Sequence, residues 1–107
     1  MKLDITQILI VFDELLPATN EEQGIYWFKA LRTDGLFVIL AFSIYEKYVD
    51  VIVQCNTRTS AASVSLKNCS EIRILDEKRK CLEILHGNAG GRCFLSLLGD
   101  SILEYNE

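Results

Sequence analysis

The stretch LFVILAFSIYEKYVDVIVQC, residues 36–55, decides the fold. Aromatic and β-branched residues fill both of its halves, and Glu46-Lys47 separates them. The alternation of apolar and polar residues in YVDVIVQ is typical of a strand with one buried face. The runs ASVSL, EIRIL and CLEIL follow it, and no Gly or Pro occurs between Gly35 and Gly87. The sequence therefore predicts one strand after another across the centre of the chain.

Ahead of these strands, residues 4–15 are predicted to form a helix. Asp4 is a good N-cap, and Gln7 three residues later completes a capping-box pattern. Apolar residues recur at helical spacing and form one face: Ile5, Ile8, Leu9, Phe12 and Leu16. Pro17 disfavours helical angles in the residue before it, so we expect the helix to end near Leu15.

Residues 20–32 carry two conflicting signals. Asn20 and Gln23 could cap a second helix, whereas IYWF at residues 25–28 is typical of a strand. Asp34-Gly35 is a dipeptide that two-residue hairpin turns prefer. We predict a strand over residues 25–32, preceded by a loop or a helical turn over residues 18–24.

Two-residue turns at Asp34-Gly35 and Glu46-Lys47 would fix the pairing of the first three strands. They would place Leu31 opposite Val38 and Phe42 opposite Val51. Because side chains alternate between faces, one face would be the core, beneath the helix. The predicted core face is Trp27, Leu31, Val38, Leu40, Phe42, Ile44, Val49, Val51 and Val53. The opposite face holds Tyr26, Phe28, Phe37, Ile39, Ser43, Tyr45, Tyr48, Asp50, Ile52 and Gln54. It suits either a protein interface or a second half-core in a curled sheet.

The second half of the chain predicts further hairpins. A loop at residues 77–79 pairs Ile74 with Leu82 and Arg73 with Glu83, so that aliphatic partners and opposite charges meet. Further strands are expected at residues 92–98 and 102–105, the last after a turn at residues 99–100. The expected fold is a single α+β domain, residues 1–107, with the N-terminal helix packed on a curved, mainly antiparallel sheet of about six or seven strands.

The net charge of −4 is unevenly distributed. Residues 1–53 hold eight acids and four bases, whereas residues 54–107 hold seven of each. An acidic chain argues against nucleic acid and anionic membranes as direct partners and favours a cationic protein. A mildly acidic balance is also ordinary for a cytosolic protein. The apolar stretch at residues 8–12 is too short to span a bilayer and lacks the basic lead of a signal peptide, so we expect a cytoplasmic location.

The four cysteines show no CxxC pair and lie 14, 12 and 12 residues apart. Each is expected to lie inside an apolar, strand-like run, which favours buried free thiols over a disulfide or a metal site. The lone His86 is flanked by a glycine-rich loop, and we expect it to be a solvated loop residue rather than a catalytic base. The sequence thus predicts no catalytic set, no metal ligands and no cofactor.

The stretches LKNCSEIRILDEKRKCLEILHG, residues 66–87, and CFLSLLGDSILEY, residues 93–105, suggest a family. They resemble the small immunity proteins of bacterial contact-dependent growth inhibition, within these the group that neutralises a ribonuclease A-like toxin. The resemblance implies a cytosolic protein without enzymatic activity that binds one toxin domain and blocks its active site.

The expected function is therefore that of an intracellular immunity protein, monomeric alone and bound 1:1 to a cationic toxin domain, an RNase. Acidic side chains would replace phosphates in the toxin's basic cleft, and tyrosines would form the packed centre. The candidate partner-binding residues are Glu21, Glu22, Asp34, Tyr45, Glu46, Tyr48 and Asp50. Two alternatives stay open: an acidic secretion chaperone, and a small α+β ligand-binding protein or enzyme with a pocket in a curled sheet.

Overall fold

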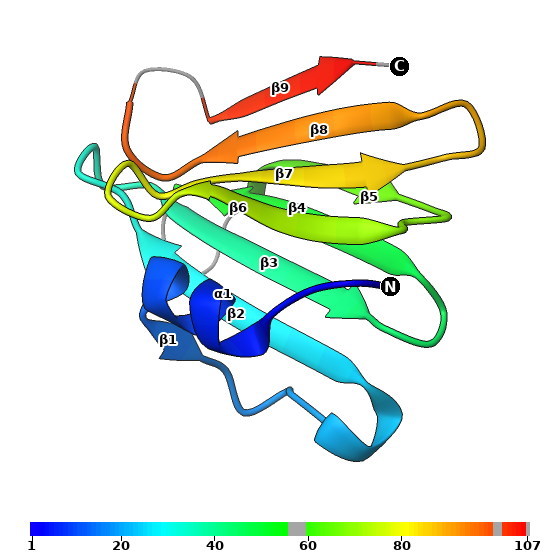
Figure 1. The fold of residues 1–107 in the computed structure, drawn as a ribbon. Helices are drawn as coiled ribbons and strands as arrows, with labels where there is room; N and C mark the ends of the chain where they lie inside the picture. The colour runs from blue at the N-terminus through cyan, green and yellow to red at the C-terminus, as the bar shows by residue number, and fades with distance from the viewer. Residues whose placement is uncertain (56–59, 100–101, 107) are drawn as a thin grey trace.

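A computed structural model describes residues 1–55, 60–99 and 102–106 (Figure 1). It contains one α-helix and two antiparallel sheets in which sequence neighbours pair. The five-stranded sheet comprises β1 (Glu14–Leu15), β2 (Ile25–Leu31), β3 (Phe37–Ser43), β4 (Tyr48–Gln54) and β5 (Ser60–Leu66). The four-stranded sheet comprises β6 (Glu71–Asp76), β7 (Cys81–His86), β8 (Gly91–Ser96) and β9 (Leu103–Asn106). The helix α1 (Ile5–Phe12) precedes both sheets, and the short 3₁₀ helix η1 (Glu21–Gln23) precedes β2.

The α+β class with an N-terminal helix is confirmed, but the strands form two sheets instead of the expected single curved one. The division falls after β5, where Asn68 takes a positive φ of 56°. The Cys69 amide then donates to the Lys47 carbonyl, and the Ser70 amide donates to the Leu85 carbonyl. These bonds turn the chain from the first sheet into the second, so β6 pairs with β7 rather than with β5. The expected turn at residues 99–100 includes Asp100, which lies outside the described residues.

The two sheets and α1 share one hydrophobic core. Figure 1 shows how these elements are arranged around it. Its fully buried large side chains include Phe12, Phe28, Phe42, Leu40, Leu82, Ile84 and Leu95. The rings of Phe12 and Phe28 lie 6.1 Å apart, and those of Phe28 and Phe42 lie 5.9 Å apart. Aromatic contacts therefore join the helix to β2 and β3, as expected for a helix that packs on the core face.

The N-terminus of α1 is as predicted, whereas its C-terminus comes earlier. The Asp4 carboxylate accepts from the Gln7 amide at 3.2 Å, which caps the first turn. The helix ends at Phe12, not near Leu15, because Asp13 adopts a left-handed φ of 72° and its amide donates to the Leu9 carbonyl. Residues 14–15 then pair with β2 as the short strand β1. A left-handed residue thus ends the helix before Pro17 acts on it.

The predicted pairing of β2 with β3 is wrong by one residue. Leu31 pairs with Phe37, not with Val38, because the connection spans residues 32–36. The Arg32 amide donates to the Leu36 carbonyl and closes this longer loop. A one-residue shift exchanges the two faces of a strand. Trp27 and Leu31 therefore leave the predicted core face, and Tyr26 and Phe28 enter it.

The pairing of β3 with β4 is displaced by two residues, so the predicted faces are preserved. Phe42 pairs with Val49 rather than Val51, across a four-residue loop instead of a two-residue turn. Ile44 consequently lies in that loop, half-buried against the core. The predicted register of β6 with β7 is confirmed at Arg73 and Glu83. A bulge follows, and Lys80 supplies a left-handed residue, φ 53°, where the sequence offers no glycine.

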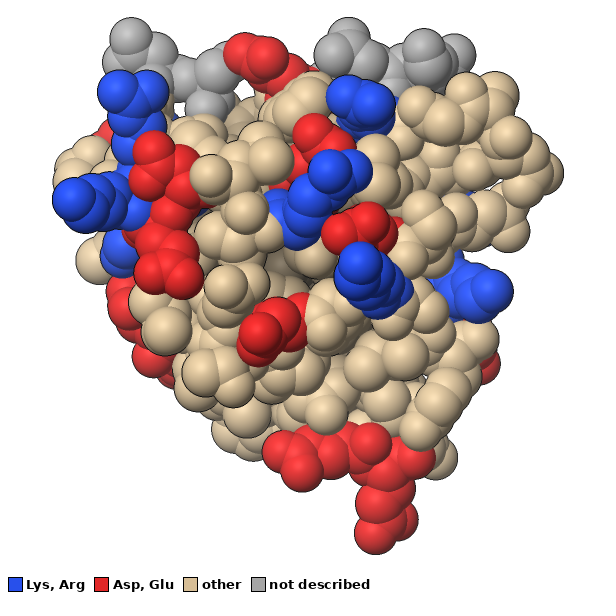
Figure 2. Space-filling model, in the orientation of Figure 1, with Lys and Arg blue, Asp and Glu red and all other residues tan. Residues whose placement is uncertain are grey.

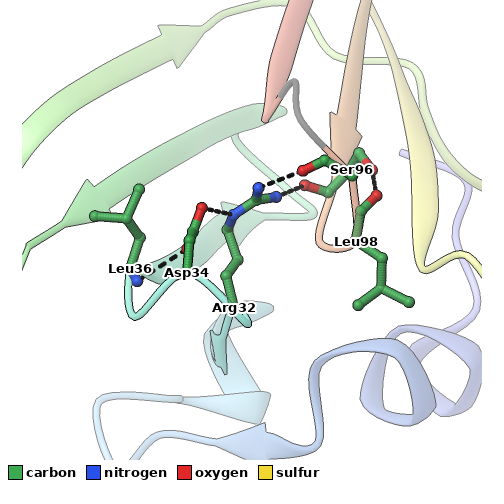
Figure 3. Close-up of polar contacts among 6 residues, drawn as sticks. Arg32, Asp34, Leu36, Ser96 and Leu98 are labelled. Atoms are coloured by element: carbon green, nitrogen blue, oxygen red, sulfur yellow. Dashed lines mark hydrogen bonds and ion pairs between the residues drawn. The ribbon is translucent and has the colours of Figure 1, made fainter.

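A buried arginine joins the two sheets at one end (Figure 3). The Arg32 side chain lies just after β2 and is 4% exposed. Its Nη1 donates to the Ser96 carbonyl at 2.8 Å, and its Nη2 donates to the Gly99 carbonyl at 2.5 Å. Its Nε donates to Asp34 at 3.1 Å. In the same loop, the Ser96 hydroxyl donates to the Leu98 carbonyl (Figure 3). Arg32 thus fastens the β8–β9 connection to the β2–β3 connection.

All four cysteines are free thiols, as predicted, but their burial differs. Cys69 and Cys93 are buried, Cys81 is half-buried, and Cys55 is exposed just after β4. Burial raises the pKa of the Cys69 thiol to about 11 and also raises that of Cys93. The expectation of four buried thiols is therefore wrong for Cys55, because the strand ends one residue before it.

The expectation of a solvated loop histidine is wrong as well. His86 is the last residue of β7, pairs with Gly91 and is 7% exposed. A Cβ built on Gly91 would lie 2.8 Å from the His86 Cε1 atom, so the ring packs directly on the glycine. In the described part of the chain, no helix has the length and apolar character that a membrane crossing requires.

Candidate functional site

Six of the seven predicted partner-binding residues lie towards one end of the five-stranded sheet. The Ile44 amide donates to the Gly24 carbonyl at 2.9 Å, which holds η1 against the β3–β4 loop. Gly24 has a left-handed φ of 68°. The Tyr45 ring covers it so closely that a Cβ atom built on Gly24 would lie 3.0 Å from the ring's Cδ2 atom. We call the following residues the acidic end: Glu21, Glu22, Tyr45, Glu46, Tyr48 and Asp50. Figure 2 shows acidic side chains projecting from the tip of the molecule where η1 lies.

Local sequence explains why these side chains meet. The Asn20 side chain caps η1 by accepting from the Gln23 amide at 3.3 Å. This cap places Glu21 and Glu22 in the first two positions of η1. The Ser43 hydroxyl accepts from the Glu46 amide at 3.1 Å and shapes the β3–β4 loop. Lys47 completes that loop with a left-handed φ of 58°. Turn chemistry therefore positions Glu21, Glu22 and Glu46, whereas the pairing of β4 with β3 and β5 positions Asp50.

The carboxylates of the acidic end lack cationic partners within the described residues. The ion pairs found there engage other acids, and none involves Glu21, Glu22, Glu46 or Asp50. With Lys47, these four acids leave a net charge of −3 at this end. Burial, and then the negative charges of Asp50 and Glu46, raise the pKa of the Tyr48 phenol. Tyr48 therefore lies within electrostatic reach of both carboxylates.

The outer face of the five-stranded sheet adjoins the acidic end. On this face, Ala41 of β3 pairs with Trp27 of β2 on one side and with Asp50 of β4 on the other. Two residues further along β3, Ser43 pairs with Tyr48. Ala41 is fully buried, whereas Trp27 and Tyr48 are half-buried. This face is thus neither a second core nor a polar surface. It is a partly covered aromatic surface with one carboxylate, and only the register error hid Trp27 from sequence reasoning.

Asp34 lies at the opposite end of the strands, in the β2–β3 loop. It accepts from the Leu36 amide at 3.1 Å and pairs with Arg32. The Leu36 bond, and then Arg32, lower the pKa of the Asp34 carboxyl. Seven-residue strands separate Asp34 from η1 and the β3–β4 loop, roughly 23 Å at the usual rise, and Asp50 lies between the two ends in β4. The structure gives it a role in the Arg32 contact and does not bring it to the other six residues.

A hollow lies elsewhere, on the outer face of the second sheet. It is a groove of about 210 Å³ lined by Leu75, Cys81, Leu82, Phe94, Leu95, Ser96, Ile102 and Glu104. Most of these side chains are apolar, and the groove is not the deep polar pocket expected of an enzyme in a curled sheet. Within the described ranges, no group of three or more His, Cys, Asp or Glu side chains could hold a metal ion.

The chemistry of the acidic end is that of recognition. It offers carboxylates and phenol rings, which accept hydrogen bonds and attract cations, and it includes no thiol or imidazole. Tyrosine rings beside charged groups are typical of protein interfaces. No protein-family model, curated protein or solved structure matches this chain.

Proposed function

We propose that this protein is an immunity protein of bacterial contact-dependent growth inhibition. It binds a cognate cationic toxin domain, an RNase, in the cytoplasm and occludes its active site. The observation that carries the proposal is the acidic end, where four carboxylates without ion pairs in the described structure lie at the same end of the sheet as two tyrosines. The resemblance of residues 66–87 and 93–105 to such immunity proteins supports it.

Binding would follow from charge complementarity. An RNase holds a polyanion, so its active-site cleft must be basic. Carboxylates on the acidic end would take the places of phosphates in that cleft, and the Tyr45 and Tyr48 rings would exclude water beside them. Tyr45 is 71% exposed, which makes its ring available for contact. The protein performs no reaction in this mechanism and acts as a monomer in a 1:1 complex.

The test is a charge reversal at the acidic end, Glu46→Lys with Asp50→Lys. Because like charges across an interface cost several kcal/mol, the dissociation constant for the proposed cognate toxin domain should rise at least ~100-fold. The matched control is Glu14→Lys with Glu77→Lys, which changes the net charge equally at exposed acids outside the acidic end. The control should leave the dissociation constant within about 3-fold.

Circular dichroism and thermal melting must first show that both double variants fold. Calorimetry then measures binding, and co-expression with the toxin measures protection of cells. If the acidic-end variant binds and protects as well as the control, this end is not the interface. If the unaltered protein neither binds nor protects, the immunity hypothesis fails. A dimer by size exclusion would then favour the secretion chaperone.

A further inference from the structure

The four outer edges of the two sheets are protected to different degrees. β1 is two residues long, and β9 is four residues long and carries Glu104. The edge of β6 is bridged by the N-terminal segment: the Lys2 amide donates to the Ser70 carbonyl, and the Ile72 amide donates to the Lys2 carbonyl, both at 2.9 Å. The edge of β5 is seven residues long and pairs, within the described residues, with β4 alone.

After a bulge at its start, β5 lacks the features that keep an edge from accepting another strand. Its sequence, SAASVSL, contains no charged residue and no proline. A bulge disturbs its first residues, but from Ala62 to Leu66 it pairs regularly with β4. Antiparallel geometry directs alternate amides and carbonyls of such a strand away from its partner. A row of donors and acceptors therefore points outward along the uncharged residues 62–66.

We propose that residues 62–66 of β5 accept an extended basic segment of the partner as a sixth strand of the sheet. Ser63 and Ser65 are exposed on the outer face, beside Ile52 and Asp50 respectively. Their small side chains leave the way to Asp50 open. The Cα atom of a lysine or arginine opposite Ser65 would lie about 10 Å from that of Asp50, which is two strand spacings. A long side chain that bends over Ser65 largely spans this distance.

A basic segment fits this edge better than a second copy of the chain. Asp50 forms no ion pair among the described residues, so a cation beside it would gain a partner. Two copies would instead approach with a net charge of −4 each. Serine and alanine side chains also add little area towards the roughly 1,200 Å² of a stable interface. The inference rests on the proposed function for the identity of the partner, but the pairing has its own test.

The probe is a nine-residue peptide of alternating lysine and valine with blocked ends. Its control has proline in place of each valine, which keeps the charge and prevents strand pairing. Amide hydrogen exchange is followed by NMR on the full chain. The lysine–valine peptide should slow exchange at least 10-fold at alternate residues between 62 and 66, and the proline peptide should not. Ser65→Lys should bind the first peptide at least 10-fold more weakly than Ser65→Glu.

Equal effects of the two peptides, or unchanged exchange in β5, would overturn the inference. Slowed exchange in β5 that rises with protein concentration and needs no peptide would identify a second copy as the occupant and overturn it too. These results are separable from the proposed function. A toxin that binds at the acidic end without protecting β5 supports the immunity proposal and contradicts strand pairing. Peptide pairing at β5 without toxin binding supports strand pairing and contradicts the immunity proposal.

Discussion

Replacing Arg32 with methionine should loosen the contact between the two sheets. The Arg32→Met change keeps an apolar stem of similar length but removes every donor of the guanidinium. The carbonyls of Ser96 and Gly99 then lose their partners. Both hydrogen bonds are part-buried, so each orphaned carbonyl should cost about 1.5 kcal/mol, towards the lower part of the range for an unsatisfied acceptor. Two such carbonyls give an expected loss of about 3 kcal/mol in the free energy of unfolding.

Urea denaturation followed by the fluorescence of Trp27, the single tryptophan, measures this loss directly. In thermal melting, about 3 kcal/mol corresponds to a fall of about 10 °C or more for a chain of this size. The control is Arg92→Met, which removes the same charge from an exposed residue of β8. If the two variants differ by less than about 0.5 kcal/mol, water replaces the guanidinium at these carbonyls and Arg32 does not hold the sheets together.

Three further outcomes test the core, the thiols and the pH response. Phe42→Ala should lower the free energy of unfolding by about 3–5 kcal/mol and Asp50→Ala by no more than ~1 kcal/mol; equal losses in denaturation would refute the assignment of faces. A thiol reagent should find four thiols after denaturation without reductant, and in the native protein it should modify Cys55 first; two or fewer thiols would reveal a disulfide. The unfolded chain releases the Cys69 proton near pH 9.0 and the native protein near 11, so stability is full below pH 9 and should fall by ~1.4 kcal/mol per unit up to about 11. The Cys69→Ala variant should lack that part of the fall, and identical pH profiles would contradict it.

Local patterns predicted those elements whose signals are complete within a few residues. The capping of α1 by Asp4 and the pairing of Arg73 with Glu83 depend on short-range chemistry, and both are found in the structure. The faces of β3 and β4 were also predictable, because an error of two residues returns every side chain to the same face. What failed was the β2–β3 connection, where Arg32 belongs to the loop.

Long-range contacts were beyond local patterns. The sequence near Arg32 gives no sign that its guanidinium reaches carbonyls 64 and 67 residues away. The division into two sheets depends likewise on the bonds of Cys69 and Ser70 to distant strands. At the candidate site, the charges of the N-terminal half predicted the acids, but only the fold separates Asp34 from the rest. Its pairing with Arg32 gives Asp34 a structural contact that the sequence did not predict.

The carboxylates of the acidic end contribute little to the stability of the fold. Their charges therefore point to a role other than folding. Exposed carboxylates that lack cationic partners repel one another, and the effect of each on stability is small and unfavourable. The backbone of η1 and of the β3–β4 loop is held by Asn20 and Ser43, whose contacts do not require the acids. Removal of the negative charge should therefore leave folding intact while it changes attraction to a cationic surface. Different residues would therefore determine stability and binding. Arg32 and the aromatic core stabilise the fold, and the acidic end is available for the proposed binding.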